Sequence, residues 1–598
     1  MSGFVALLDG HAGAEMRDAL RNLTATLAFR GPDGLRSAVM PPVGMGESLL
    51  AADPGAACGP HSLGESLWLC GDIRIDGQEE LRAALRRDGE RPEPDGPDGM
   101  LVLHAYRAWG TRVASALLGD FAFALWDAER RRLLCARDAL GVKLFYYARP
   151  IGAFVCSNTL ATVLAHPAVA RELHLPALED FLRTGFNEDV TRTSIRDVRR
   201  LPPGHTLVAQ VDRSAPRIER YWSFPESAPD ETTAPRAMVE RCRTLLDVAV
   251  RDRVRGSRVG ILMSGGLDSP SIAAAVKRTR PGCAVHAWTN VHERIAVDHE
   301  GEYSRLATSF LGIAHTVRSL DDMRPLTHLS DRAPVDAEPF DISTMDSYRA
   351  HLREASGYAP VLLFGEDADT VFEAPTFVEM WRRESRPGLL ARIACFAFRR
   401  GRLPYLGTGV RRRLLELRSE SPPKLPRWVR ASPASEPQDT SRHSTTALER
   451  HLQAPVWQWF FESIDAGVTR APVEVRLPLI DLRLIAFATT VPGVPLRQGK
   501  LILRRAARGA LPDAVIRRPK APLRGGLEQA VENWRAGGPA PSISHAVALD
   551  LVDSRALTET LERGSAEQVV HAWRALELDD WLRRRDAGAA TAGPPAAC

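Results

Sequence analysis

Long hydrophobic runs are missing from this chain of 598 residues. No apolar stretch approaches the roughly 20 residues that a membrane-spanning helix needs. The first residues also lack the basic segment followed by an apolar one that is typical of a secretion signal. We therefore expect a cytoplasmic protein without a membrane partner. The formal net charge of +4 is small for this length, so the composition by itself does not indicate a nucleic-acid partner.

Paired cysteines are missing as well. The eight cysteines are scattered along the chain and include no CxxC pair. This argues against a zinc site and against a disulfide framework, and it is typical of a reducing compartment. The chain is long: 598 residues are too many to fold around a single hydrophobic core. We therefore expect two or more domains.

Two regions of different character follow each other along the chain. Residues 1–215 contain short apolar or alternating runs such as Leu67–Ile75, interrupted by a few helical stretches, which predicts an α+β domain of stacked sheets. Residues 216–236 are rich in Pro, Ser, Thr and acidic residues, as in a linker. In residues 237–598 apolar strands alternate with helical stretches. This alternation predicts a doubly wound parallel sheet.

The stretch VGILMSGGLDSPSIAAAVKR (Val259–Arg278) joins an apolar strand to a helix through a small polar turn. Such a turn at the carboxyl end of a parallel strand presents free backbone N–H groups to an anion. Gly265 and Gly266 let the backbone approach phosphate oxygens closely, and Ser264 and Ser269 add hydroxyl donors. The pattern predicts a phosphate-binding loop.

This loop lacks the lysine of the GxxxxGK[ST] motif, which disfavours an ordinary P-loop ATPase. Asp268 is not suited to direct phosphate contact, because like charges repel. Its natural role is to hold a Mg²⁺ ion that bridges phosphate groups. A generic glycine-rich turn is the alternative, but SGGLDS between a strand and a helix is more specific than SGG alone.

SGGLDS is the signature of the N-type ATP pyrophosphatases, which adenylate a substrate and release pyrophosphate, and the surrounding chain resembles the asparagine synthetase family. Seven stretches are similar to family landmarks, in family order: RGPDG (Arg30–Gly34), GDFAFALWD (Gly119–Asp127), ARDALGVKLFYY (Ala136–Tyr147), FGEDAD (Phe364–Asp369), EVRLPLID (Glu474–Asp481), KLILRRA (Lys500–Ala506) and LPDAVIRRPK (Leu511–Lys520). The resemblance implies an N-terminal Ntn-hydrolase-like (glutaminase-like) sandwich and a C-terminal ATP-pyrophosphatase domain.

The resemblance also implies roles for single residues. Asp369 is implied as a second Mg²⁺-binding acid opposite Asp268, with a helix N-cap as the alternative. Glu366 is implied as the base that takes a proton from the attacking amine, and Lys520 as the lysine that stabilises negative charge on the acyl-adenylate. A surface carboxylate is the alternative for Glu366. The expected ATP contacts are Leu262, Ser264, Gly265, Gly266, Leu267, Asp268, Ser269, Phe364, Gly365, Lys500 and Arg504; an ordinary core position is the alternative for Leu262 and Phe364, and a surface pair for Lys500 and Arg504.

A catalytic cysteine is missing from the N-terminus. Family members that use glutamine begin with cysteine after Met removal, whereas this chain has Ser2. The family's Asn-Gly-Glu stretch is replaced by Cys70-Gly71-Asp72, and residues 44–54 lack the arginine that holds the glutamine carboxylate; Asp98 is retained. A site that binds the zwitterion glutamine loses several kcal/mol of binding free energy when a buried charged partner is missing. We therefore expect no glutaminase activity, with a Ser2 hydroxyl nucleophile as the alternative.

Without ammonia from glutamine, the attacking amine most economically belongs to the substrate itself. The resemblance then points to the ring-closing branches, namely lasso peptide cyclases (macrolactam synthetases) and β-lactam or carbapenam synthetases. Residues 381–446 form a basic insertion, and between Trp381 and Arg430 there are 14 Lys or Arg and 3 Glu. A solvated helical face is the ordinary explanation of such a run, but a basic insertion beside FGEDAD favours a peptide substrate.

The expected reaction uses ATP and Mg²⁺ to adenylate an Asp or Glu side chain of a precursor core peptide. The peptide's α-amine then forms an isopeptide macrolactam, with release of AMP and pyrophosphate. The resemblance implies a leader peptidase and a leader-binding protein as partners. The alternatives are ring closure of a small amino acid, an ammonia-dependent asparagine synthetase, and a non-catalytic scaffold that binds nucleotide.

Overall fold

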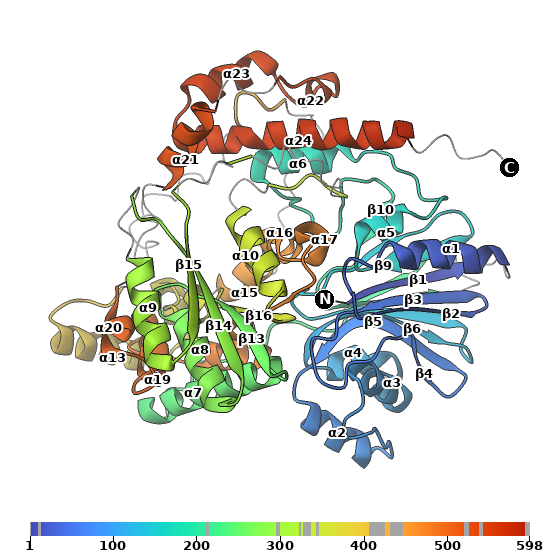
Figure 1. Cartoon of the computed structure of the whole chain (residues 1–598). Helices are drawn as coiled ribbons and strands as arrows, with labels where there is room; N and C mark the ends of the chain where they lie inside the picture. The colour runs from blue at the N-terminus through green and yellow to red at the C-terminus, as the bar shows by residue number, and fades with distance from the viewer. Residues whose placement is uncertain are drawn as a thin grey trace.

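The computed structural model consists of two domains and a layer of C-terminal helices (Figure 1). The described residues are 2–9, 14–210, 215–225, 227–294, 299–321, 325–326, 337–341, 346–366, 368–405, 425–430, 447–519, 526–537 and 542–591. Among them, no helix is both long and apolar enough to cross a lipid bilayer.

The N-terminal domain is a sandwich of two antiparallel sheets (Figure 1). In strand β1 (Gly3–Asp9), alternate side chains beginning with Phe4 enter the core between the sheets. The others, beginning with Val5, pack against helix α1 (Ala14–Ala25). This is the period of two that a strand buried on both faces requires.

The other strands of the sandwich are β2 (Gly34–Met40), β3 (Val43–Leu49), β4 (His61–Leu63), β5 (Leu67–Ile75), β6 (Gly119–Asp127), β7 (Arg132–Arg137), β8 (Tyr146–Ala148), β9 (Ala153–Ser157), β10 (Val198–Arg200), β11 (His205–Gln210) and β12 (Arg217–Arg220). The first sheet has the order β10-β8-β9-β1-β3-β2 and the second β12-β11-β7-β6-β5-β4. Helices α2 (Gln78–Arg87), α3 (Asp98–Trp109) and α4 (Val113–Ala116) share a core with the second sheet. The predicted α+β sandwich is confirmed.

The C-terminal domain is built on a five-stranded sheet in which every strand pair is parallel. Its strands are β13 (Arg258–Leu262), β14 (Ala284–Val291), β15 (Ala314–Ser319), β16 (Val361–Phe364) and β17 (Glu474–Arg476). The order β15-β14-β13-β16-β17 reverses direction between β13 and β16. Ligands of open α/β sheets bind outside the carboxyl ends of strands at such a switch point. The predicted doubly wound sheet is confirmed, and its switch point lies where SGGLDS and FGEDAD begin.

Helices surround this sheet (Figure 1). The first begins at Pro235, where a proline is well tolerated because the first helical N–H has no intrahelical partner. These helices are α7 (Pro235–Arg253), α8 (Asp268–Thr279), α9 (Glu300–Leu311), α10 (Asp346–Ser356), α11 (Ala368–Phe372), α15 (Ala447–Leu452), α16 (Pro455–Ser463), α17 (Ala466–Thr469), α18 (Leu482–Thr490), α19 (Leu501–Ala506) and α20 (Asp513–Arg517).

A layer of helices near the C-terminus packs on α6 (Leu175–Thr184) of the first domain (Figure 1). Its residues form a separate hydrophobic core around Trp573. This layer ties the end of the chain to the N-terminal domain. It consists of α21 (Gly526–Arg535), α22 (His545–Ala548), α23 (Ser554–Arg563) and α24 (Ala566–Thr591).

Two predicted segments have partly regular structure. Strand β12 lies at the start of the predicted linker 216–236, and α7 begins at its end. In the basic insertion 381–446, α12 (Phe377–Arg383) and α13 (Arg386–Arg400) are helical. Residues 406–424 and 431–446 of this insertion lie outside the described residues.

Buried ion pairs cross the interface between the two domains. Lys143 of the first domain lies 3.2 Å from Glu474 of β17. Asp53 of the first domain receives two hydrogen bonds from the Arg476 guanidinium, at 2.9 and 2.8 Å. Such pairs hold the domains in one orientation, because separating them would leave desolvated charges without partners.

Candidate active site

The loop after β13 is braced by its own hydroxyl groups. Ser269 Oγ accepts a hydrogen bond from the Ser264 N–H at 2.8 Å, and Ser264 Oγ accepts one from the Gly266 N–H at 3.2 Å. Leu267 is buried and anchors the turn in the core. Helix α8 begins at Asp268, so the free N–H groups of its first turn lie beside this loop.

The loops after β13 and β16 approach each other so closely that glycine is required. A Cβ on Gly365 would lie 2.9 Å from the Ser269 backbone nitrogen. A Cβ on Gly265 would lie 2.9 Å from the Glu300 carbonyl oxygen and 2.3 Å from the Arg518 guanidinium. Gly365 therefore allows the loops after β13 and β16 to meet, and Gly265 allows the phosphate loop to pack against Glu300 and Arg518.

Two predicted metal-binding acids meet at this site around one lysine. The Lys500 ammonium lies 2.6 Å from Asp268 Oδ2 and 2.7 Å from Asp369 Oδ1. Burial raises the pKa of Asp268 above its ordinary value, and the Lys500 ammonium opposes that shift. Two acids from the loops that follow two adjacent strands thus contact the same ammonium group.

The donor set at these acids fits Mg²⁺. Asp268 Oδ1 is buried without a hydrogen-bond partner among the described residues, so it is available to a cation. Carboxylate oxygens suit this hard ion, which commonly uses one or two carboxylates plus phosphate oxygens and water. Asp268 and Asp369 would hold the ion, with Lys500 turning toward phosphate. Among the described residues, no group of three or more Asp, Glu, His or Cys side chains could form a complete protein cage.

Two of the expected ATP contacts, Leu262 and Phe364, and the expected base Glu366 lie at or just after the ends of the two central strands. Leu262 and Phe364 are paired in the β13–β16 register. Leu262 is buried in the core, whereas Phe364 is half-buried and stacks on Phe460 at 5.9 Å between ring centroids. Glu366 follows in the turn after β16 and is half-buried. The structure therefore brings the predicted base to the same edge of the sheet as the phosphate loop.

Arg504 has a supporting position. Its guanidinium donates hydrogen bonds to the backbone carbonyl groups of Gly499 at 2.9 Å and Arg518 at 3.0 Å. It therefore braces the segment that leads to Lys520, and it lies near enough to Asp268 for the charges to interact. Lys520 itself lies outside the described residues.

Sequence reasoning missed a carboxylate on the phosphate loop. Glu300 Oε2 accepts a hydrogen bond from the Gly265 N–H at 2.6 Å, and its Oε1 lies 2.7 Å from Arg518 Nη2. The Arg518 guanidinium also lies over the Tyr303 ring, 4.6 Å from its centroid. The Glu300 carboxylate thus occupies a place where the loop can bind an anion. ATP phosphate would have to displace it, which would free Arg518 for the phosphate.

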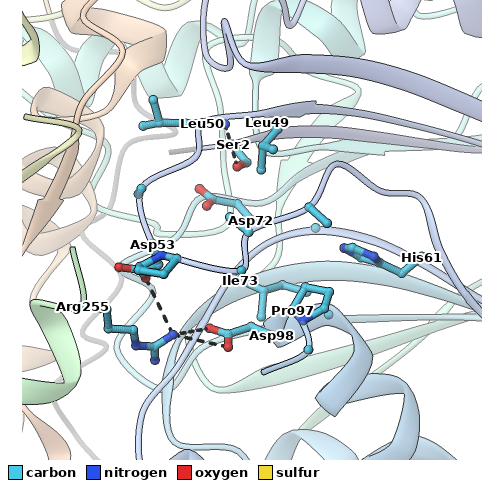
Figure 2. A pocket seen from close by; sticks show the side chains of 18 of the residues that line it. Ser2, Leu49, Leu50, Asp53, His61, Asp72, Ile73, Pro97, Asp98 and Arg255 are labelled. Carbon is cyan, nitrogen blue, oxygen red and sulfur yellow. Dashed lines mark hydrogen bonds and ion pairs between the residues drawn. The ribbon is translucent and has the colours of Figure 1, made fainter. Parts of the chain in front are cut away.

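A pocket of about 300 Å³ lies between the two domains, and most of its wall belongs to the N-terminal domain (Figure 2). Ser2 lines it, and its hydroxyl oxygen accepts a hydrogen bond from the Leu50 N–H at 3.2 Å. The pocket does contain arginine, which the sequence of residues 44–54 did not predict. Arg255 arrives from the C-terminal domain and lies 3.1 Å from Asp98 and 3.7 Å from Asp53. Its charge is therefore already balanced.

A protein carboxylate also occupies the backbone donors of this pocket. Glu47 accepts hydrogen bonds from the Gly59 N–H at 2.9 Å and the Gly71 N–H at 3.2 Å. Asp72, beside Gly71, lies 2.9 Å from the Lys143 ammonium. Burial raises the pKa of Glu47 to about 8. Arg82 also lines the pocket and donates hydrogen bonds to the Gln78 side chain and the Glu93 carbonyl group. A glutamine entering here would meet the Glu47 acid at the backbone donors, and a serine instead of a cysteine.

Glu47→Gln is expected to change the pH dependence of stability. The folded-state pKa of Glu47 lies near 8 and the ordinary value is 4.5, so the wild type loses free energy of unfolding as pH rises through that window. Glutamine does not titrate. The stability of the variant relative to wild type should therefore rise between about pH 5 and pH 8, by at least about 1 kcal/mol, the effect of a one-unit shift.

Urea unfolding at a series of pH values measures this difference. Glu240→Gln is a matched control, because the Glu240 side chain is 67% exposed. A constant difference between Glu47→Gln and wild type across the window would show that Glu47 ionises normally in the folded protein.

These features define a class of protein: a glutamine-amidotransferase-type sandwich joined to an ATP-pyrophosphatase-type domain. Two family models match the chain accordingly, "Glutamine amidotransferase domain" over residues 1–222 and "Asparagine synthase" over residues 241–583. The second match spans more than half of the chain. The chain therefore belongs to the asparagine synthase family, as an ATP-dependent amide-forming enzyme.

Relatives extend over both domains. The chain is 26% identical over 535 residues to asparagine synthetase [glutamine-hydrolyzing] 3 of Bacillus subtilis, covering 85% of this chain and 84% of that protein. It is also 26% identical over 544 residues to a putative asparagine synthetase [glutamine-hydrolyzing] of Mycobacterium bovis, covering 84% and 82%. A solved glutamine phosphoribosylpyrophosphate amidotransferase of B. subtilis is 12% identical, with a TM-score of 0.28 and coverage of 61% and 90%.

Proposed function

We propose that this enzyme closes a ring in a peptide. In the first step, a side-chain carboxylate of Asp or Glu attacks the α-phosphorus of ATP, and pyrophosphate leaves. In the second step, the α-amine of the same peptide attacks the activated acyl carbon, AMP leaves, and the amine gives up a proton. The product is an isopeptide macrolactam, as in the lasso peptide cyclases.

The N-terminal pocket is the observation that carries this proposal. It has Ser2 where glutamine-dependent relatives have cysteine, and the Glu47 carboxylate takes the Gly71 N–H. Arg255 is already paired with Asp98. A site of this kind is a poor source of ammonia, because its nucleophile is a hydroxyl group in place of a thiol and an internal acid occupies its backbone donors. An amine carried by the substrate removes the need for that source.

The residues at the switch point have separate tasks in the proposed reaction. Bound Mg²⁺ would neutralise phosphate charge, held by Asp268 and Asp369. The Lys500 ammonium would leave these acids and contact the departing pyrophosphate, because a compact ammonium group is suited to stabilise the negative charge of pyrophosphate. Glu366 at the end of β16 would accept the proton of the attacking amine. Holding the amine and the acyl group together is worth up to about 7–11 kcal/mol in favourable intramolecular reactions.

The basic insertion supports a peptide over a small substrate. Helix α13 exposes apolar side chains, with Leu390 52% and Phe398 91% accessible, and it ends in Arg399 and Arg400. An exposed surface of mixed apolar and basic character is typical of a site for a chain molecule. A small amino acid bound in the active site would not contact such a surface outside it.

An ammonia-dependent asparagine synthetase is the second candidate. The names of the relatives favour asparagine as the product, although they specify hydrolysis of glutamine as the source of nitrogen. Both candidates use the same adenylation site, so ATP consumption alone does not separate them. They differ in the source of nitrogen, which is the substrate's own α-amine in one case and free ammonium in the other.

The test is incubation of the whole chain with ATP, Mg²⁺ and a library of linear peptides. Each peptide has a free α-amine and a single Asp or Glu at a varied position. We expect loss of one water from a subset of peptides, with one AMP formed per ring. The matched library with an acetylated α-amine should form no ring. Asparagine formed from aspartate and ammonium, with no dehydrated peptide, would contradict the proposal.

A further inference from the structure

A second pocket lies between the N-terminal sandwich and helices α15 and α16. Its volume is about 180 Å³. We call it the aromatic pocket, because rings and other apolar side chains make up most of its wall. These are Leu140, Val190, Pro202, Pro203, Trp222, Phe224, Leu452 and Trp457.

One polar group in this wall lacks a partner. Trp457 is 7% exposed, and its indole N–H makes no hydrogen bond among the described residues. Three other polar side chains of the wall have partners: His205 contacts the Pro203 carbonyl group, Arg220 the Trp222 carbonyl group, and Gln458 both Arg137 and Glu462. A buried donor without a partner costs about 1–3 kcal/mol. A hydrogen-bond acceptor in the aromatic pocket would recover that free energy.

The size of the pocket sets the kind of group that fits. An apolar cavity of about 150 Å³ in another protein holds a benzene molecule, and the aromatic pocket is slightly larger. Trp222 and Phe224 meet edge to face, with centroids 4.7 Å apart, and both remain half-buried. The pocket therefore suits one aromatic or branched aliphatic side chain, with a carbonyl oxygen to accept from Trp457.

A row of rings connects this pocket to the active site. On helix α16, Trp457 contacts Phe460 with centroids 5.4 Å apart, and Phe460 stacks on Phe364 at 5.9 Å. Phe364 ends β16 and directly precedes Gly365 and Glu366. Trp457 of the aromatic pocket thus lies about one helical turn from Phe460, and Phe460 contacts Phe364 at the adenylation site.

We infer that the aromatic pocket binds an apolar side chain of the linear peptide substrate, with a peptide carbonyl group accepting a hydrogen bond from the Trp457 indole. This inference rests on the proposed function, because it assigns a recognition site to the same peptide. The aromatic pocket would then select among peptides. A peptide binds when its aromatic or branched residue reaches the pocket while its reacting Asp or Glu lies in the adenylation site, and it stays bound while the ring closes.

The first test measures binding without turnover. N-acetyl-phenylalaninamide is the probe, observed by saturation-transfer NMR on the full chain, and N-acetyl-alaninamide is the small control. We expect binding of the first and not of the second. Ala139→Phe, which places a ring in the pocket wall, should abolish binding. Trp457→Phe keeps the bulk and removes the N–H, so it should weaken binding about five-fold, the effect of one hydrogen bond of about 1 kcal/mol.

Trp459→Phe is the matched control. Trp459 lies on the same helix, has an indole N–H without a partner among the described residues, and lines a different cavity of about 20 Å³. Its probe affinity should equal that of the wild type. Equal loss in both tryptophan variants, or no probe binding to the wild type, would overturn the inference.

The second test uses peptides found by mass to lose water. Ala139→Phe should raise KM at least about ten-fold with kcat nearly unchanged, because the pocket binds the ground and transition states alike. Cyclisation by Ala139→Phe with an unchanged KM would contradict the inference about the aromatic pocket and would leave the proposed function intact. Probe binding by the wild type without any dehydrated peptide would contradict the proposed function, and the aromatic pocket would then be a binding site for another apolar ligand.

Discussion

Asp268→Asn is expected to reduce ATP–pyrophosphate exchange by at least about 1000-fold, which corresponds to about 4 kcal/mol of lost transition-state stabilisation. Asparagine keeps the shape of the side chain and loses its charge. Among the described residues, Asp369 is the other acid that contacts Lys500 together with Asp268. A single carboxylate cannot both balance the lysine and hold the ion that neutralises phosphate charge.

The measurement is exchange of labelled pyrophosphate into ATP in the presence of a competent peptide. Asp247→Asn is the matched control, since Asp247 lies on α7 and pairs with Arg278 away from the switch point. Its exchange rate should equal that of the wild type. The Asp268 variant should remain folded, because burial already disfavours its ionised form. Full exchange by Asp268→Asn would contradict the assignment of the metal site.

Much of the fold could be predicted because the apolar pattern follows the secondary structure. Leu67–Ile75 was predicted as a strand and has the bounds of β5, and the polar turn after Val259–Met263 does join a strand to a helix. Short parallel strands flanked by helices have few alternatives. Strand β17, at Glu474–Arg476, was not predicted as a strand, because three residues are too short for a period to be recognised.

The candidate site could be predicted only in part. SGGLDS and FGEDAD are adjacent because their strands are paired, so local pattern and topology together bring Asp268 and Asp369 to one place. Glu300 and Arg255 could not be found in this way. Their roles depend on which loop they reach across the fold, and an isolated Glu or Arg in a helix turn has no distinctive sequence signal.

The interface between the domains also depends on partners far apart in sequence. Arg30 is completely buried, and its guanidinium contacts both carboxylate oxygens of Asp465 in the other domain. It also donates hydrogen bonds to Thr159 Oγ1 at 2.5 Å and the Asn158 carbonyl group at 3.2 Å. Arg30 begins RGPDG, a stretch that the sequence identified only by resemblance. The structure supplies a physical reason for it, because one side chain joins the sandwich to the helical end of the synthetase domain.

Arg30→Ala is therefore expected to destabilise the protein by about 3–5 kcal/mol, because it leaves the buried Asp465 carboxylate without its partner. Denaturant unfolding measures the loss, and Arg21→Ala is the control, since its ion pair with Asp18 is exposed and worth at most about 1 kcal/mol. Removing both charges, in Arg30→Ala with Asp465→Ala, should cost less than the sum of the single variants, because no orphaned charge remains. Additive losses would mean that the pair does not couple the domains. A partly unfolded intermediate in Arg30→Ala alone would show that this pair keeps the two domains unfolding as one unit.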